Sequence, residues 1–550
     1  MPPRRSSSVP QTPVEEFYYQ GKASFENLVA LANYQERIND ARKIVWRDRG
    51  EPVVQLPTLR ACLVHAGKGG ARSAYLAFSI RVSFNLFLLL IKLRRVPRAR
   101  WFSLVRDAIF GNDCFQFASM MGTFAALYKF LLNALPLLFP VKPPPLLPVD
   151  RDDDNEDGSA FPSGATTPGI HMKHREPPQL SLSAQAQMAL IRKRTRRWHS
   201  TVAGAISGGL ALMCETRGRR VAFAQQIFVR GLQGTYNTYS EKWGISIPYG
   251  AVLVFSLACG QIMYAFFLRP DTLPPAYNNW ILAASKASPD AFALNIQAVQ
   301  EHTIDLHALG KLISRPDVTP SNLAQLRSLR ARVLAGETDI PYYAPCYALH
   351  ADNNFCTASL FFRFLEVARW MLPIYSALHF LPTLLFRWKS LRKDPLRVLA
   401  RGTVGSLRSS TFLGMFVVIC QSVFCIKHQT YERIMALPPS SLVRQLLPQA
   451  LIDILLHKRT WWLSGFLTGL ALLIEDQRRR AELAMYVLPK GLESLWIAAR
   501  GRGYVAHTGN WGESVLAAVG MGMVMTIYQN DPQHLSGLVR RILYQFIGPN

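Results

Sequence analysis

The chain has 550 residues, of which 49% are hydrophobic and 18% are charged, and 62 Lys and Arg residues outnumber 36 Asp and Glu residues to give a net charge of +26. This length exceeds one ordinary domain, and the low charged fraction favours a membrane protein over a soluble one. Most basic residues flank apolar runs, where they reach lipid headgroups, so no nucleic-acid partner is expected. The eight cysteines lie mostly within apolar segments, which favours free thiols over a secreted disulfide framework.

Composition divides the chain into five parts. They are a partly disordered N-terminal tail (1–57), a first membrane module (58–268), a polar helical bridge (269–341), a second membrane module (342–530) and a C-terminal tail (531–550). Within the first module, residues 141–183 are rich in proline, glycine and acid and predict a disordered linker. Within the bridge, "SNLAQLRSLRARVLAGE" from residue 321 predicts a helix.

The apolar runs are short for membrane spans. A helix rising 1.5 Å per residue needs about 20 residues to cross a hydrocarbon core of about 30 Å. Residues 243–268 meet this length without a charged interruption, whereas 74–93 and 114–140 are interrupted by Arg81 and Lys129. Shorter uncharged runs occupy residues 198–214, 370–386, 409–426, 460–474 and 514–530. We predict an all-α, multi-pass membrane protein of short helices; the alternative is a large soluble helical protein with buried core helices.

One pattern recurs after 260 residues. "GGLALMCETRGRRVAFAQQIFVRGL" begins at residue 208, and "TGLALLIEDQRRRAELAMYVLPKGL" begins at residue 468. Each copy includes a Gly-xxx-Gly pair, which lets helix backbones approach closely in lipid. These helix-packing glycines are Gly204 and Gly208 in the first copy, and Gly465 and Gly469 in the second. The recurrence predicts two homologous modules of short, glycine-containing helices.

Charged residues occupy equivalent places in the two copies. Glu215 and Glu475 precede the arginine clusters, and Arg230 and Lys490 follow them. In one interpretation, each glutamate pairs locally with an arginine three to five residues later at the membrane surface. In the other, these four residues line a polar groove between the modules that receives an anionic lipid or fatty-acyl ligand.

Cysteine and histidine also cluster in both copies. Cys62 and His65 precede the first apolar pair of helices, and Cys346 and His350 precede the second. These four would form a Cys2His2 zinc set if the copies faced each other, but the spacing is loose for a zinc site. A structural cap at the mouth of each first helix is the expected role, without a metal or cofactor.

Sequence signatures of common enzymes are absent. The chain has no phosphate-binding Gly-rich loop ending in Lys-Ser/Thr, no Gly-x-Ser-x-Gly elbow and no His-Glu-x-x-His. "HAGKGGARS" from residue 65 is similar to a phosphate loop only superficially. We therefore expect no enzyme.

Three stretches are similar to the transmembrane protein 135 family: "PCYALHADNNFCTASLFFRFLEVARWMLPIYSALHFLPTLLFR", "LRSSTFLGMFVVICQSVFC" and "GFLTGLALLIEDQRRRAELAMYVLPKGLESLW". The resemblance covers most of residues 58–530. It is more specific in the second half, because "LVHAGKGGARS" in the first half lacks the third cysteine of the Cys346, His350, Cys356 cluster. The helix containing Gly465 is also distantly similar to one in the mitochondrial inner-membrane import-channel subunits.

The resemblance implies a non-enzymatic integral membrane protein of the peroxisome or mitochondrion. Its expected role is lipid or small-molecule movement and organelle organisation, including mitochondrial fission. The alternative is a membrane scaffold that recruits soluble organelle-division or protein-import machinery through the 141–183 linker. The expected partners are the lipid bilayer, an anionic lipid or fatty-acyl ligand, and division or import proteins.

Overall fold

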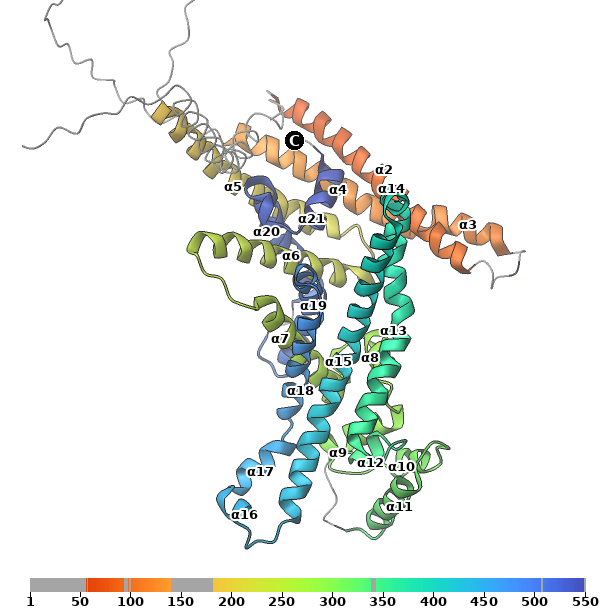
Figure 1. The fold of residues 1–550 in the computed structure, drawn as a ribbon. Helices are drawn as coiled ribbons and strands as arrows, with labels where there is room; N and C mark the ends of the chain where they lie inside the picture. Colours follow the sequence, from red (N-terminus) through yellow and green to blue (C-terminus); the bar gives the residue numbers. More distant parts are fainter. Residues whose placement is uncertain are drawn as a thin grey trace, which may run out of the picture. The chain divides into compact units, whose positions relative to one another are not determined.

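The computed structural model describes residues 58–92, 100–139, 182–337, 343–386, 388–505 and 508–548, together with Leu56 and Pro97. Every element in these ranges is a helix, which confirms the all-α prediction (Figure 1). The predicted tail at 1–57 lies outside the described residues except for Leu56. The predicted linker at 141–183 also lies outside them except for its last two residues, which begin a helix.

The α-helices are α2 (Leu59–Lys92), α3 (Trp101–Phe110), α4 (Asn112–Leu138), α5 (Leu182–Leu212), α6 (Arg217–Trp243), α7 (Gly250–Leu268), α8 (Pro275–Ser285), α9 (Pro289–Glu301), α10 (Leu306–Ile313), α11 (Pro320–Leu334), α12 (Cys346–Leu349), α13 (Cys356–Phe386), α14 (Trp388–Lys393), α15 (Pro395–Ala436), α16 (Leu442–Leu446), α17 (Gln449–Leu456), α18 (Thr460–Thr468), α19 (Gln477–Gly501), α20 (Gly512–Asn530) and α21 (Gly537–Ile547). Short 3-10 helices are η3 (Pro270–Thr272), η4 (Gly469–Ile474), η5 (Gly509–Trp511) and η6 (Pro532–His534). The helix predicted from residue 321 is α11.

Four helical segments are long and apolar enough to cross a membrane. They are Leu59–Leu90, Trp101–Leu138, Gly250–Leu268 and Pro395–Ala436. These segments contain most of the apolar runs expected at 74–93, 114–140, 243–268 and 409–426. Thr460–Ile474 is a shorter apolar helix. The run at 370–386 lies in α13, which is not among the four. These segments support a membrane protein.

The charge that interrupts the first span is paired. Arg81 of α2 donates from Nε to Oδ2 of Asp113 in α4 at 2.6 Å. The two helices pack along each other, so the pair ties one span to the next. A charged side chain in a span has to find such a partner or face water. Arg81 is therefore compatible with a membrane-spanning α2.

The described residues belong to two compact units. The first comprises residues 1–218 and 521–550, and the second comprises residues 219–520. Each unit thus takes helices from both halves of the sequence. The boundaries predicted at 268 and 342 do not coincide with these units, because α7, from the first half, packs against α18 and α19, from the second.

The first unit is built on the hairpin of α2 and α4. Its close packing depends on small residues: a Cβ at Gly70 would lie 2.9 Å from the Gly122 carbonyl oxygen, and one at Gly122 would lie 2.9 Å from Ala74 Cβ. Helix α4 also packs against α5, and α21 packs against α2. Ala77, Ala118 and Phe546 form one small buried cluster of this unit.

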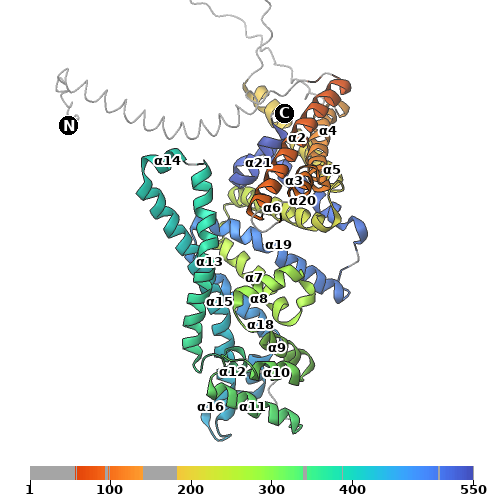
Figure 2. The ribbon, with the colours of Figure 1, turned by 90° about the vertical axis from the view of Figure 1, so that its right-hand side faces the viewer.

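The second unit is built on a long hairpin in which α13 and α15 lie side by side (Figures 1 and 2). Helix α7 packs against α18 and α19 beside it. The predicted polar bridge forms α8 to α11, and its helices α9, α10 and α11 share a buried core that contains Leu294, Leu309 and Leu326. The bridge therefore folds as a part of the second unit.

The order of elements recurs along the chain. Helices α6, α7 and η3 are followed by α8, and α19, α20 and η6 are followed by α21, with the additional short helix η5 between α19 and α20. Corresponding elements begin 260 to 262 residues apart, at Arg217 and Gln477 and again at Gly250 and Gly512. A duplicated module predicts this pattern.

Candidate ligand cavity in the second unit

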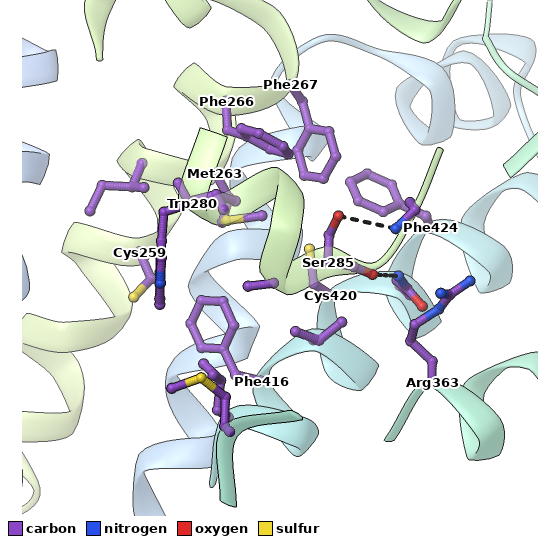
Figure 3. Close-up of a pocket in the computed structure, with 18 of the residues that line it drawn as sticks. Cys259, Met263, Phe266, Phe267, Trp280, Ser285, Arg363, Phe416, Cys420 and Phe424 are labelled. Atoms are coloured by element: carbon purple, nitrogen blue, oxygen red, sulfur yellow. Dashed lines mark hydrogen bonds between the residues drawn. The ribbon is translucent and has the colours of Figure 1, made fainter. Parts of the chain in front are cut away.

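The second unit contains a cavity of about 590 Å³ (Figure 3). Its walls come mainly from α7, α8, α13 and α15. The lining residues belong largely to the two hydrophobic clusters of this unit. A cavity of this volume falls within the range of sites that hold small-molecule ligands.

Aromatic rings form one wall of the cavity. The ring centroids of Phe267 and Phe424 lie 4.6 Å apart, and those of Phe424 and Trp461 lie 4.5 Å apart. Packed rings of this kind resist rearrangement, because each fills a specific gap. Helix α7 supplies much of this wall because it is apolar around its whole circumference and is therefore buried on several sides. The wall favours a hydrocarbon ligand.

One edge of the cavity is polar. In Figure 3, Arg363 lies on the opposite side of the view from Cys259 and Trp280. Helix α8 ends at Ser285, and Lys286 follows in the left-handed conformation. The Lys286 carbonyl oxygen accepts a hydrogen bond from Arg363 Nη1, and the Ser285 carbonyl oxygen accepts one from Gln421 Nε2 at 3.2 Å.

Arg363 is the charged residue of this edge. Its side chain is only 10% exposed, and Nη1 lies 3.0 Å from Oε2 of Glu366, whose side chain is 52% exposed. Its Nε is buried and has no hydrogen-bond partner in the described part of the chain. Burying an unsatisfied donor on a charged group costs free energy, so this atom favours a ligand that accepts a hydrogen bond.

The other unsatisfied polar atoms of the lining residues are donors as well. They are Asn295 Nδ2 and Trp461 Nε1. Asn295 Oδ1 is already used, since it accepts from the Ala344 backbone N–H at 3.4 Å. Burial raises the pKa of the Tyr277 hydroxyl, which therefore remains a neutral phenol in the lining. The cavity thus has an apolar body, and three of its lining residues, one of them the cationic Arg363, each carry an unsatisfied buried donor.

Arg230 and Lys490, predicted to line a groove, both pair with acidic residues of α19; the Lys490 partner is three residues away along the chain, and the Arg230 partner is 252 residues away. Arg230 Nη2 lies 2.7 Å from Glu482 Oε2, and Lys490 Nζ lies 2.7 Å from Glu493 Oε2. Neither residue lines the cavity.

Glu475 and Glu215 are both 2% exposed. Glu475 Oε1 accepts from Ser409 Oγ at 2.9 Å and pairs with Arg479 Nη1 at 2.8 Å. This ion pair spans four residues along the chain, as the local-pairing interpretation expects. Glu215 Oε1 accepts from the Thr216 backbone N–H at 2.9 Å.

The predicted helix-packing glycines are buried. A Cβ at Gly465 would lie 2.6 Å from the Cys259 carbonyl oxygen and 2.7 Å from Met263 Cβ. A Cβ at Gly469 would overlap Ser256. These two glycines bring α18 and η4 against α7, which carries part of the cavity wall.

Gly204 makes the equivalent contact in the first unit. A Cβ there would lie 2.8 Å from the Met521 carbonyl oxygen and 2.7 Å from Met525 Cβ. Met521 and Met525 follow Cys259 and Met263 by 262 residues. Gly208 is buried on the same helix, α5.

The cysteine and histidine candidates fall in different units. Cys62 is fully buried in α2 of the first unit, which also contains His65. Cys346 and His350 lie in the second unit, where Cys356 and Cys425 join them; the ligand atoms of these four residues all lie within 4.8 Å of one another. The candidate set is therefore different from the one suggested by the sequence.

Two residues of the second unit were missed from the sequence. Arg363 lies three residues before Glu366, and a basic residue inside an apolar helix is itself a signal for a polar site. Cys425 has only a weak signal, because it is 69 residues from Cys356 and is brought to it by the α13 and α15 hairpin.

Comparisons with protein families, with curated proteins and with solved structures found no match to this chain.

Proposed function

We propose that this protein is a non-enzymatic, multi-pass membrane protein that binds a single-chain anionic lipid in the cavity of its second unit and takes part in moving such lipids. The observation that carries this proposal is the apolar cavity whose lining residues include Arg363, a cation with an unsatisfied buried donor. A carboxylate or phosphate headgroup has only acceptor atoms at physiological pH and would pair with this cation.

The apolar body of the cavity suits the hydrocarbon chain of such a ligand. Each methylene group removed from water contributes about 0.8 kcal/mol. Phe267, Phe416 and Phe424 provide apolar surface for this burial. An acyl chain is also flexible enough to follow a cavity between helices. Hydrocarbon burial therefore supplies most of the expected affinity, and the headgroup supplies selectivity.

The ligand headgroup has to compete with Glu366 for Arg363. The Glu366 side chain is half exposed, and an exposed ion pair contributes only about 0–1 kcal/mol. A hydrogen bond to a charged group contributes about 1.5–3 kcal/mol, and Arg363 Nε has no partner to give up. The free energy gained by the hydrogen bond to the headgroup therefore exceeds that lost with the exposed Glu366 ion pair, which favours ligand binding.

The wider proposal concerns ancestry and location. The recurring order of elements and the equivalent contacts of Gly204 and Gly465 support two homologous modules. We place the protein in the membrane of the peroxisome or mitochondrion, with a role in organelle organisation, on the family resemblance.

Ligand binding by the full-length protein in detergent tests the proposal. Radiolabelled palmitate is compared with hexadecanol, which has the same chain and no charge. We expect wild-type protein to bind palmitate more tightly, and Arg363→Gln to weaken palmitate binding about 10- to 100-fold while leaving hexadecanol binding unchanged.

Arg369→Gln is the matched control, because Arg369 is an exposed arginine of the same helix outside the cavity lining. It should bind palmitate as wild type does. Equal affinity of wild-type protein for palmitate and hexadecanol, or an unchanged palmitate affinity in Arg363→Gln, would refute the proposal.

A further inference from the structure

Four side chains of the second unit form a cluster with metal-binding chemistry. They are Cys346 at the start of α12, His350 just after it, Cys356 at the start of α13 and Cys425 in α15. One ligand atom from each lies within 4.8 Å of the others. Three thiols and one imidazole are a complete ligand set for structural zinc.

We propose that these four residues bind a single zinc ion. Zn–S bonds of about 2.3 Å and a Zn–N bond of about 2.1 Å place neighbouring ligand atoms of a tetrahedron roughly 3.6–3.8 Å apart. His350 Nε2 already lies 3.2 Å from Cys356 Sγ. Shifts of about an ångström or less bring the remaining atoms around one ion. A two-iron cluster would need wider spacing, because its ligands lie on opposite sides of an iron pair.

The surroundings of His350 orient its ring for this role. Its Nδ1 lies 3.0 Å from the Asn353 carbonyl oxygen, so donation from Nδ1 leaves the Nε2 lone pair directed at the cluster. Asn322 in turn donates from Nδ2 to the Ala351 and Asn353 carbonyl oxygens, both at 3.0 Å, and holds the loop in place. Metal-binding histidines are usually fixed by a second hydrogen bond of this kind.

A further contact stabilises one of the sulfur ligands. Gln429 donates from Nε2 to Cys356 Sγ at 2.9 Å. Three thiolates around Zn²⁺ carry a net charge of −1, and an N–H donor to sulfur offsets part of it. His350 and Cys425 are each 8% exposed, and Cys346 and Cys356 are partly buried, so the site is partly shielded from solvent.

The zinc site would have a structural role. Four protein ligands leave no open position for a reacting water. The ion would tie the loop between α12 and α13 to α15. Because His350, Cys356 and Cys425 also line the cavity, it would fix one part of the cavity wall. The inference does not depend on which ligand the cavity holds.

Metal analysis of the purified full-length protein tests this proposal. Wild-type protein expressed in zinc-supplemented medium should contain about one zinc per chain, and Cys425→Ser less than about 0.2. Cys420→Ser is the matched control, since Cys420 is a buried, cavity-lining cysteine of the same helix outside the cluster, and it should retain about one zinc. A zinc-free wild type, or full zinc in Cys425→Ser, would overturn the proposal.

X-ray absorption spectroscopy of the wild-type protein keeps the proposal testable if Cys425→Ser fails to fold. A shell of three sulfur atoms and one nitrogen atom supports the site. A shell of only nitrogen and oxygen atoms contradicts it, because an ion held elsewhere on the surface would give that result. A disulfide between two of the three cysteines in peptide mass spectrometry also contradicts it.

Discussion

Replacing Gly465 by alanine tests whether the packing of α18 against α7 depends on close contact between their backbones. The new Cβ would lie 2.6 Å from the Cys259 carbonyl oxygen and 2.7 Å from Met263 Cβ. Neither atom is the end of a flexible side chain, so the helices have to separate. Overpacking of this kind costs about 1–3 kcal/mol, while alanine gains up to about 1 kcal/mol of helix propensity over glycine.

A second glycine separates these two effects. Gly310 lies inside α10, and a Cβ there would meet no atom within 4 Å. Gly310→Ala therefore gains helix propensity without a clash. Because the propensity gain is common to both substitutions, Gly465→Ala should be less stable than Gly310→Ala by about 1–3 kcal/mol. Gly204→Ala should resemble Gly465→Ala, since its Cβ would meet Met525 Cβ at 2.7 Å.

The assay is unfolding of the purified full-length variants in the same detergent, followed by circular dichroism during heating and by denaturant titration. The result predicted is a lower midpoint for Gly465→Ala than for wild type and a midpoint for Gly310→Ala at or above that of wild type. If Gly465→Ala proves as stable as Gly310→Ala, the inference that α18 and α7 pack through close backbone contact is wrong.

Three further predictions follow from charges and from the linker. A hydrogen bond from Arg315 lowers the pKa of Asp317, so this pair stabilises the fold above about pH 4, and its contribution is lost as pH falls through the lowered pKa. Asp317→Asn should remove that part of the pH dependence of stability. Hydrogen exchange of the α10–α11 region at pH 5 and pH 3 measures this change. Arg230→Glu places two carboxylates together and should lower the unfolding midpoint, and the charge swap with Glu482→Arg should restore it; equal midpoints for single and double variants would argue against the ion pair. Deletion of residues 145–180 should leave palmitate binding and flux in reconstituted vesicles unchanged, whereas loss of partner recruitment would favour a scaffold role.

The helical fold was predictable from local sequence. Residues 243–268 contain no charged residue after Trp243, and this alone predicted a span there; its helix, α7, begins at Gly250. The recurring sequence pattern was equally visible, because it depends on the order of residues along the chain. The packing of these elements in space was not visible in the sequence, because α7 contacts α18 and α19, which lie more than 190 residues away along the chain.

The candidate sites illustrate the same limit. Cys346 and His350 were recognised because they are four residues apart, but Cys425 joins them only when α13 folds back on α15. Arg230 and Lys490 were conspicuous as equivalent charges; Lys490 pairs with Glu493 on its own helix, whereas Arg230 pairs with Glu482, 252 residues away. Arg363 was missed because its distinguishing property, a buried Nε without an acceptor, exists only in the folded chain.

Tryptophan quenching by brominated palmitate tests most directly whether the cavity holds an anionic acyl chain. Bromine quenches only the indoles that it contacts, and Trp280 and Trp461 line the cavity whereas Trp496 and Trp511 do not. We predict that brominated palmitate quenches wild-type fluorescence and that most of this quenching is lost in the double variant Trp280→Phe, Trp461→Phe. It should persist in Trp496→Phe, Trp511→Phe. Equal loss of quenching in the two double variants would contradict binding in the cavity.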